Sequence, residues 1–388
     1  MTIDLKYSAA ESALRAEARA WLHANVPKAP LPSFDTPEGF AAHREWERRL
    51  NEGRWGMVTW PKEYGGRGLN LIEWLVFEEE YYRANAPGRV NQNGLFLFGP
   101  TLMEYGTSGQ KERFLPRLAA GDDIWAQAWS EPQAGSDMAA IRSTATRVGD
   151  EYVIRGHKIW SSRAVFADWC FGLFRTEAGS ERHKGLSYIV APLKGPGVRV
   201  RGIPQIDGEP GFAEIFFEEV RVPVANRIGD EGAGWSIAMA TAGFERGLML
   251  RSPARFQMTA KRLVELYRKH AGRCEPGLAT TVAQAWMDAQ AYCLSTYATA
   301  ARLIAGGTIG VEASVNKIFW SELDIAMHRA ALSILGAHAA LMRQAPAARD
   351  DAGWVEGFLF ALAGPIYAGA NEVQRNIIAE RCLGMARS

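Results

Sequence analysis

The spacing of apolar positions changes twice along the chain. Residues 8–123, and the chain from Gly234 onward, carry apolar residues at the three- and four-residue intervals of amphipathic helices. Residues 124–232 instead carry short alternating or wholly apolar runs, which Gly, Pro and charged turns separate. The pattern predicts an α+β multidomain protein with an N-terminal α-helical domain (1–123), a small central β-barrel or β-sandwich domain (124–232) and a C-terminal four-helix bundle (233–388).

Local signals mark individual helices on both sides of the β region. Ser8 and Glu11 have the spacing of a capping box before a first helix. Residues 71–84 predict another helix, which carries an acidic run at positions 78–80. We interpret this run as a solvated face and not as a metal site, because neighbouring side chains on a helix diverge by about 100°. In the C-terminal part, long periodic segments predict helices over 234–270, 279–304, 311–342 and 352–383.

A loop of small residues opens the β region. It reads Ser-Glu-Pro at 130–132 and Ala-Gly-Ser-Asp at 134–137. Gly135 allows the backbone to approach a ligand closely, and Ser130 and Ser136 supply hydroxyl groups. Backbone N–H groups that are exposed in such a turn can bind a phosphate.

An alternating strand follows and reaches Trp160 and Ser162. Side chains two residues apart on a strand face the same way, so an indole should lie beside a hydroxyl. This pair suits a flat heteroaromatic ring that needs stacking and one hydrogen bond. On these residues alone, a hairpin with a core tryptophan is the simpler interpretation, because aromatic residues are usually buried.

Composition and charge narrow the class of protein. The 388 residues are 47% hydrophobic and 22% charged, which is typical of a globular protein with large cores. The chain has 44 basic and 43 acidic residues, which gives a net charge of +1. This charge is too small to attract nucleic acid or an anionic membrane. No apolar run is long enough to span a bilayer, and the N-terminus lacks the order of a signal peptide. We therefore expect a soluble, cytoplasmic protein.

The four cysteines are widely spaced and form neither a CxxC pair nor a zinc spacing: Cys170, Cys274, Cys293 and Cys382. We expect reduced packing thiols, and no metal site. The chain also lacks the GxGxxG, GxxxxGK[ST], HExxH and GxSxG motifs.

The stretch from Trp125 to Trp169 resembles the signature of the acyl-CoA dehydrogenase family, flavoproteins that oxidise acyl-CoA thioesters. The similarity continues along nearly the whole chain, with several motifs in the same order and at the same separations. The resemblance implies that FAD is the cofactor and that Ser136 lies near the flavin phosphates and the CoA arm. It also implies a set of residues that border the flavin ring: Gln127, Trp129, Ser130, Trp160 and Ser162.

A second part of the resemblance lies near the C-terminus. Residues 369–381 are similar to the segment that flanks the flavin in the family, which implies that Gly369, Asn371 and Glu372 bind the cofactor. A threonine that is common in the family is replaced by Ala370. The backbone N–H of Ala368 can still donate to the thioester oxygen of a substrate, because a backbone group needs no side chain.

The reaction that the family implies, α,β-dehydrogenation, needs a carboxylate base with a raised pKa in a water-poor pocket. Many members supply it as Glu in a Tyr-Glu-Gly triplet, but this chain has Tyr367, Ala368 and Gly369 there. Alanine cannot accept a proton. The base must therefore come from another segment.

Some branches of the family carry the base in a Glu-Arg pair on the first long helix of the C-terminal bundle. Glu245 and Arg246 match that pair, and Phe244 and Leu248 would help to desolvate Glu245. We expect Glu245 to be the catalytic base and Arg246 to bind the rim of the active site or CoA. The alternative is an ordinary charged helix surface.

Two further family motifs are altered. The Arg-Lys-x-Phe-Gly segment is absent, and the Gln-x-x-Gly-Gly segment reads Ser-Ile-Leu-Gly-Ala at 333–337. In the family these segments reach the FAD of a neighbouring subunit, so such contacts are in doubt here. Branches with this divergence act on bulky or branched acyl groups, and some assemble from unlike subunits.

The resemblance thus implies an acyl-CoA substrate in the catabolism of fatty acids or steroid side chains. It also implies an electron-transfer flavoprotein as electron acceptor, and a homotetramer or a heterotetramer with a homologous subunit. Two alternatives stay open. One is a weakly catalytic or non-catalytic subunit that completes the site of an unlike homologue, and the other is a flavin oxidase or monooxygenase on the same fold.

Overall fold

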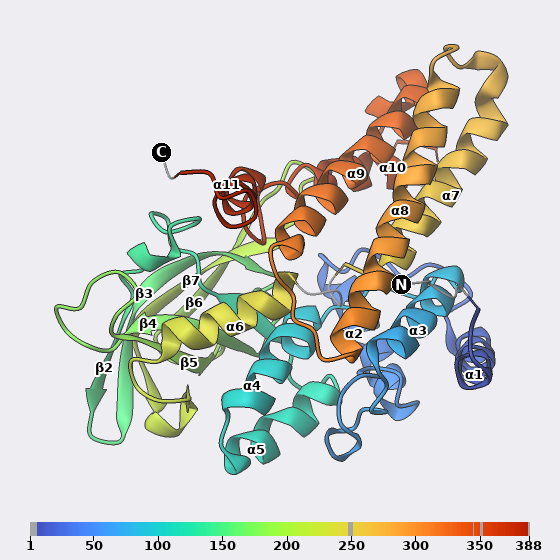
Figure 1. The fold of residues 1–388 in the computed structure, drawn as a ribbon. Helices are drawn as coiled ribbons and strands as arrows, with labels where there is room; N and C mark the ends of the chain where they lie inside the picture. The colour runs from blue at the N-terminus through green and yellow to red at the C-terminus, as the bar shows by residue number, and fades with distance from the viewer. Residues whose placement is uncertain (1–5, 247–250, 344, 350–351, 387–388) are drawn as a thin grey trace. The chain divides into compact units, whose positions relative to one another are not determined.

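The computed structural model describes residues 6–246, 251–343, 345–349 and 352–386. Figure 1 shows the elements coloured along the chain. Helices come first: α1 (Ala9–Asn25), α2 (Pro37–Glu52), α3 (Leu71–Arg83), α4 (Gly99–Tyr105) and α5 (Ser108–Ala119). Strands follow: β1 (Trp125–Ala128), β2 (Thr144–Val148), β3 (Glu151–Ser162), β4 (Trp169–Arg175), β5 (Leu186–Pro192), β6 (Val198–Ile203), β7 (Phe212–Pro223) and β8 (Arg227–Ile228). The chain ends in helices: α6 (Gly234–Arg246), α7 (Pro253–His270), α8 (Leu278–Ile304), α9 (Glu312–Leu335), α10 (Gly353–Ala361) and α11 (Asn371–Arg381). This order confirms the predicted α+β fold.

The chain folds into two compact units, neither of which is continuous in sequence. Unit 1 contains Met1–Val26, Asn70–Ala86 and Arg246–Ser388, and unit 2 contains Pro27–Leu69 and Pro87–Glu245. Helices α1 and α3 therefore belong with α7 to α11, whereas α2, α4, α5 and α6 belong with the strands. The domain limits predicted after residues 123 and 232 describe the order in sequence and stay a proposal.

Unit 2 is built around an eight-stranded sheet. Its strand order is β6-β7-β3-β2-β4-β5-β8, and β1 pairs in parallel with β4. The inward-facing residues of the alternating runs form one apolar core, which includes Tyr152, Phe174, Ile189, Ile215 and Phe217. This core positions β1 and β3, the two strands that carry most of the predicted site residues.

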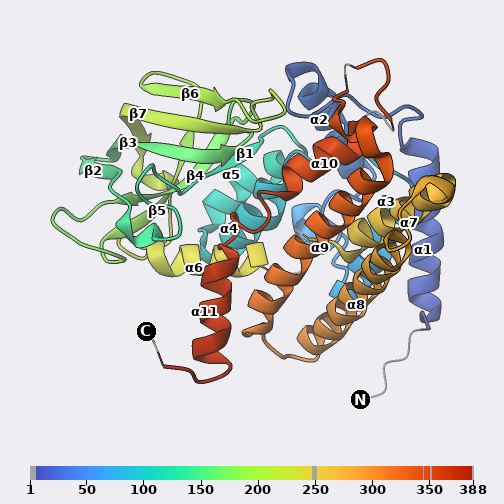
Figure 2. The ribbon, with the colours of Figure 1, turned by 90° about the horizontal axis from the view of Figure 1, so that it is seen from above.

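Unit 1 contains the long helices α7, α8 and α9, which run side by side in Figures 1 and 2. Their apolar stripes meet in a core that includes Phe256, Leu263, Trp320 and Met327. Helices α10 and α11 pack against α9.

Two of the predicted C-terminal helices are interrupted, so their predicted extents were wrong. The segment 234–270 contains α6 and α7, and the second helix begins at Pro253, which suits a first helical turn but not a helix interior. The segment 352–383 contains α10 and α11, with Gly364 and Pro365 in the connection. Apolar periodicity continues across both breaks and hides them in the sequence.

The acidic run at 78–80 is not the solvated face that we predicted. Glu78 and Glu80 are buried on α3. Arg15 on α1 contacts Glu79 and Glu80 at 2.7 Å each, and Arg19 contacts Glu80 at 2.8 Å. Burial raises the pKa of Glu80, but hydrogen bonds from Arg19 and Arg15 outweigh burial and lower the pKa to about 2. The arginines of α1 thus neutralise this face of α3.

Candidate functional site

Strand β1 and the residue after it present two buried donors that lack acceptors. Gln127 pairs in register with Phe171 of β4, and Trp129 directly follows the strand. Nε2 of Gln127 and Nε1 of Trp129 are buried and have no hydrogen-bond partner within the described part of the chain. An unsatisfied buried donor costs about 1–3 kcal/mol. Both residues therefore fit a bound ligand that offers acceptors.

A buried ion pair fixes the loop after β1. Nζ of Lys158 lies 2.8 Å from Glu131 and donates to the carbonyl of Trp129 at 3.3 Å. The Glu131 carboxylate also accepts from the backbone N–H groups of Arg142 and Ser143, at 2.7 and 3.0 Å. Burial raises the pKa of Glu131, but the charge and hydrogen bond of Lys158 outweigh it and lower the pKa to about 2. Neither role was predicted, because a Glu and a Lys so far apart in sequence give no signal of contact.

A break in the register of β3 exposes Trp160. The pairing of β3 with β7 shifts between Lys158 and Ser161, and Trp160 there adopts a φ of 60°. Few residues other than glycine enter this left-handed region. The indole is 57% exposed, Ser161 is buried and Ser162 is half-buried. Trp160 is therefore not a core residue: its ring meets that of Phe212 at an interplanar angle of 83°, with the ring centres 6.1 Å apart, and much of the indole stays exposed.

The residue after this strand is anchored by a distant segment. Arg163 has a φ of 51°, and its Nε lies 2.8 Å from Asp35. Its guanidinium also lies 4.0 Å from the centre of the Phe34 ring. Burial raises the pKa of Asp35 despite the nearby charge of Arg163. The segment at 34–35 thus holds the end of β3 that carries Trp160 and Ser162.

Ser130 and Ser136 differ in their surroundings. Ser130 is half-buried, and its carbonyl accepts a hydrogen bond of 2.9 Å from the N–H of Ile159 on β3. Ser136 is exposed and precedes Asp137, which forms two hydrogen bonds with Arg182 at 2.8 and 2.9 Å. Ser130 is therefore tied to the strand of Trp160, whereas Ser136 lies on an open loop.

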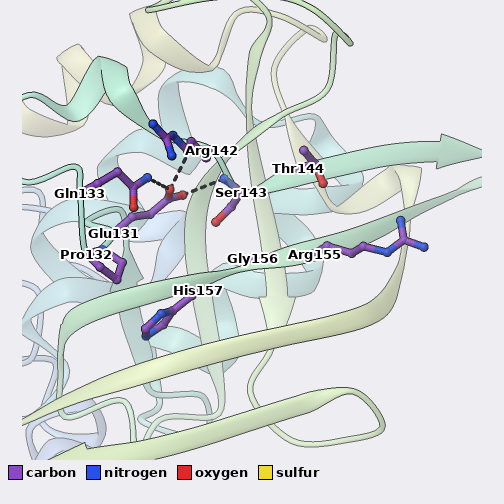
Figure 3. A pocket seen from close by; sticks show the side chains of 9 residues that line it. All are labelled: Glu131, Pro132, Gln133, Arg142, Ser143, Thr144, Arg155, Gly156 and His157. Atoms are coloured by element: carbon purple, nitrogen blue, oxygen red, sulfur yellow. Dashed lines mark hydrogen bonds between the residues drawn. The ribbon is translucent and has the colours of Figure 1, made fainter.

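Unit 2 carries an open pocket of about 380 Å³. Figure 3 shows the side chains that line it. Nine residues line it: Glu131, Pro132, Gln133, Arg142, Ser143, Thr144, Arg155, Gly156 and His157. The carboxylate of Glu131 accepts from Gln133 and from backbone N–H groups, and His157 lies 2.9 Å from Glu214. Because these groups are engaged inside the unit and the pocket is lined by other residues than the predicted ones, we assign it no ligand.

The predicted base stands at the end of α6. Glu245 and Arg246 are the last two residues of this helix, and their side chains lie outside the described part of the structure. Leu248 lies outside it as well. One turn earlier, Thr241 and Ala242 are buried. The roles of Glu245 and Arg246 stay a proposal.

The connection between α10 and α11 carries a left-handed turn. Ala368 and Gly369 have φ values of 55° and 90°, and the N–H of Asn371 closes the turn on the carbonyl of Pro365 at 2.8 Å. Among the described residues, the N–H of Ala368 meets no acceptor. A Cβ at Gly369 would lie 2.4 Å from Nε2 of Gln374, so this position requires glycine. The N–H groups of Gly369 and Ala370 meet no acceptor among the described residues either, so the turn offers a short run of unpaired backbone donors that includes Ala368.

Asn371 and Glu372 begin α11 but have different surroundings. The Asn371 side chain is buried, accepts from Lys317 at 2.7 Å and donates to Ser321 at 3.1 Å. The Glu372 side chain is exposed and lies 3.8 Å from Arg375. Asn371 therefore has a structural task inside unit 1, and a cofactor contact of either residue stays a proposal.

Metal-binding clusters and membrane spans are both missing from the described ranges. No group of three or more His, Cys, Asp or Glu side chains there is placed to hold a metal ion. No helix in those ranges combines the length and the apolar content that a bilayer crossing requires. The four cysteines are free thiols, and burial raises the pKa of Cys170 and Cys293 to about 12.

Models of a single family match nearly the whole chain. The acyl-CoA dehydrogenase N-terminal domain matches residues 8–122, the middle domain 126–220 and the C-terminal domain 232–383. The chain is 40% identical over 383 residues to acyl-CoA dehydrogenase IpdE1 of Mycobacterium tuberculosis, a match that covers 96% of this chain and 97% of that protein. It is 31% identical to acyl-CoA dehydrogenase FadE26 of the same organism, over 99% of each.

Solved structures with the same fold include two complexes of paired chains. The Tcur3481-Tcur3483 steroid ACAD superposes with a TM-score of 0.87 and 31% identity, over 100% of each chain. The ChsE4-ChsE5 complex from Mycobacterium tuberculosis superposes with a TM-score of 0.84 and 31% identity, again over 100% of each chain.

Proposed function

Because the chain belongs to the acyl-CoA dehydrogenase family, we propose that Glu245 is the base that removes the α-proton of its acyl-CoA substrate. The protein is an FAD-dependent oxidoreductase, and FAD, when bound, supplies the acceptor for the hydride that leaves the β-carbon. The observation that carries the proposal is Ala368, which stands where many members of the family have their catalytic Glu. A base is still needed, and Glu245 occupies the alternative position.

In this mechanism Glu245 takes the proton while negative charge develops on the thioester oxygen. The N–H of Ala368, which has no acceptor among the described residues, is the donor that we assign to that oxygen. A hydrogen bond that strengthens as the charge grows lowers the barrier and not only the KM. Apolar neighbours such as Phe244 would raise the pKa of Glu245 and make it a stronger base.

We assign the remaining predicted residues to the two ligands, FAD and the acyl-CoA substrate. Trp160 would stack on the flavin ring, Ser162 and Ser130 would contact its edge, and the unpaired donors of Gln127 and Trp129 would reach its acceptors. We assign Arg246 and Ser136 to the CoA part of the substrate. Gly369, Asn371 and Glu372 would flank the cofactor from the C-terminal segment.

We infer that the acyl group is bulky and ring-bearing. One solved relative is named a steroid ACAD, and the small side chain of Ala368 leaves room where a Glu would stand. An electron-transfer flavoprotein would reoxidise the enzyme. A CoA thioester of a steroid-derived acid is therefore the substrate to try before straight-chain thioesters.

A second candidate function is supported by the paired chains of the relatives. Both solved structures named above are complexes of two different chains, and the altered family motifs put contacts to a neighbouring FAD in doubt. The chain would then be a weakly catalytic or non-catalytic subunit that completes the site of a homologue.

The test is flavin bleaching without oxygen. We expect a steroid-derived acyl-CoA to bleach the flavin of the wild-type holoprotein, and Glu245→Gln to slow bleaching by about 10²–10⁴-fold, because the base is lost while FAD stays bound. Glu265→Gln on α7, an exposed carboxylate, is the matched control and should react like the wild type. Wild-type rates in Glu245→Gln would rule out this base. Bleaching that occurs only after a homologous chain is added would favour the second candidate.

A further inference from the structure

Helix α9 presents a row of buried polar residues inside an apolar core. Ser314, Lys317 and Ser321 recur at three- and four-residue spacing, so they lie on one face of the helix. All three are buried, with exposed fractions of 4%, 2% and 0%. Their neighbours on the same helix, Trp320 and Leu323, belong to the apolar core of unit 1. An ammonium group is costly to bury, so the place of Lys317 requires compensation by specific acceptors.

The acceptors of Lys317 lie in the connection between α10 and α11 and at the start of α11. Its Nζ donates to the carbonyl of Gly364 at 2.8 Å and to Oδ1 of Asn371 at 2.7 Å. These two residues bound the segment 364–371, so one ammonium joins both ends of it. Ser321 supports the arrangement, because its hydroxyl accepts from Nδ2 of Asn371 at 3.1 Å. We call the contact of Lys317 with Gly364 and Asn371 the Lys317 clamp.

The segment that the clamp closes is conformationally strained. Ala368 and Gly369 are consecutive left-handed residues, and Ala368 lacks the freedom of glycine. A left-handed residue other than glycine costs roughly 1–3 kcal/mol and persists only where its surroundings fix it. The clamp supplies such a constraint on both sides of Ala368.

We propose that Lys317 is a positioning residue for the reaction: by joining Gly364 and Asn371, it holds the N–H of Ala368 in place to bind the thioester oxygen. The inference rests on the function proposed above, in which this N–H stabilises the developing charge. Preorganised donors contribute to catalysis because they need no rearrangement as the reaction proceeds. Lys317 itself touches neither the substrate nor the cofactor in this scheme.

If Lys317 only stabilised the fold, its variants would behave differently from those of a positioning residue. Loss of a structural contact would loosen the helices of unit 1 together and would reduce the fraction of folded, FAD-containing protein. Loss of a positioning contact would loosen the segment 364–371 and would lower kcat in the protein that remains folded. KM would change little, because the bond to the oxygen strengthens only as charge develops.

The test uses the full-length holoprotein and two variants. Lys317→Met removes the clamp. Lys317→Arg keeps the positive charge, but its guanidinium is planar and differs in length from the ammonium side chain. Lys261→Met on α7 is the control, since Lys261 has a 55% exposed side chain. We expect backbone amides in 364–371 of Lys317→Met to exchange hydrogen about 10-fold faster or more, with α8 unchanged. We also expect kcat to fall about 10- to 100-fold at an unchanged FAD content, and Lys317→Arg to lie between this variant and the wild type.

Wild-type exchange in 364–371 in both Lys317 variants would overturn the proposal, and so would a loss of activity that lies in KM alone. If Lys317→Met does not fold, Lys317→Arg decides by the same two measurements. If the wild type oxidises no acyl-CoA, the proposed function is the part that fails. Hydrogen exchange then still decides whether Lys317 fixes the segment.

Discussion

At the scale of the residue, the loop after β1 depends on a charge that is buried with its partner. Lys158 is fully buried, and it compensates Glu131 at 2.8 Å while it also binds the carbonyl of Trp129. Removal of one partner of such a pair costs more than the pair contributes, because the other charge stays in the interior without compensation. Glu131 and Lys158 should therefore act on stability as a unit.

We expect Glu131→Gln to lower the free energy of unfolding by about 3–5 kcal/mol at neutral pH. The pKa of Glu131 falls from 4.5 to about 2 in the folded protein, so its stabilising effect is complete above pH 4.5 and is lost as the pH falls toward 2. The Tm of the variant and of the wild type should thus converge as the pH falls through this window. Thermal unfolding followed by circular dichroism measures this.

The matched control is Glu219→Gln, which removes an exposed carboxylate that pairs with Arg155. This variant should keep the wild-type Tm at neutral pH, because exposed pairs contribute little. A Tm equal to that of Glu131→Gln would show that the buried pair has no special role.

At the scale of the element, two interruptions of regular structure, one in each unit, contain residues of the predicted site. The register shift in β3 exposes Trp160, and the connection between α10 and α11 holds Ala368 and Gly369 in left-handed conformations. Regular strands and helices use their backbone groups internally, so a backbone donor for a ligand becomes available only where they break. A side chain from a distant segment binds next to each interruption: Asp35 contacts Arg163, and Lys317 donates to Asn371.

Gly369→Ala tests the second interruption. A side chain at a φ of 90° is strained, and its Cβ would lie 2.4 Å from the buried amide of Gln374. We expect a destabilisation of about 1–3 kcal/mol, measured by urea unfolding of the holoprotein. Gly272→Ala is the control, because a Cβ there meets nothing within 4 Å and the φ is not positive. Equal unfolding midpoints for both variants would mean that the turn relaxes without cost.

At the scale of the whole molecule, we expect the assembly to affect how FAD is bound. Of the two family motifs that reach a neighbouring subunit, one is absent from the chain and the other is altered. One solved relative is the ChsE4-ChsE5 complex, and another is named as a pair, Tcur3481-Tcur3483. A contact that one chain has lost can be supplied by a homologous partner. If a homologous chain supplies this contact, a heterotetramer accounts for the altered motifs, and the flavin content of the purified protein tests it.

We expect the protein purified alone to hold less than one FAD per chain, and co-expression with a homologous partner chain to restore full occupancy. Absorbance gives the ratio of flavin to protein, and light scattering after size exclusion gives the mass of the assembly. Addition of free FAD during purification controls for a limited supply in the cell. One FAD per chain in a homo-oligomer would contradict the heteromer and support a self-contained enzyme.

The sequence by itself determined features that depend on near neighbours or on the order of motifs. The capping box at Ser8 and Glu11 is confirmed in both of its hydrogen bonds, at 3.2 and 2.7 Å. The order of motifs identified the family and its cofactor, and the alanine at 368 showed that the usual base is absent. Such signals can be recognised in the sequence because capping and motif residues act within a few positions of one another.

Only the tertiary structure decided which charges are buried and what fixes the irregular segments. No pattern in the sequence indicates that Arg15 and Arg19 neutralise the acidic face of α3, or that Lys317 joins Gly364 to Asn371. Each of these contacts joins segments that are distant in the chain. Whether a charged residue is solvated or buried depends on what packs against it, and that is settled when the units fold and not by local sequence.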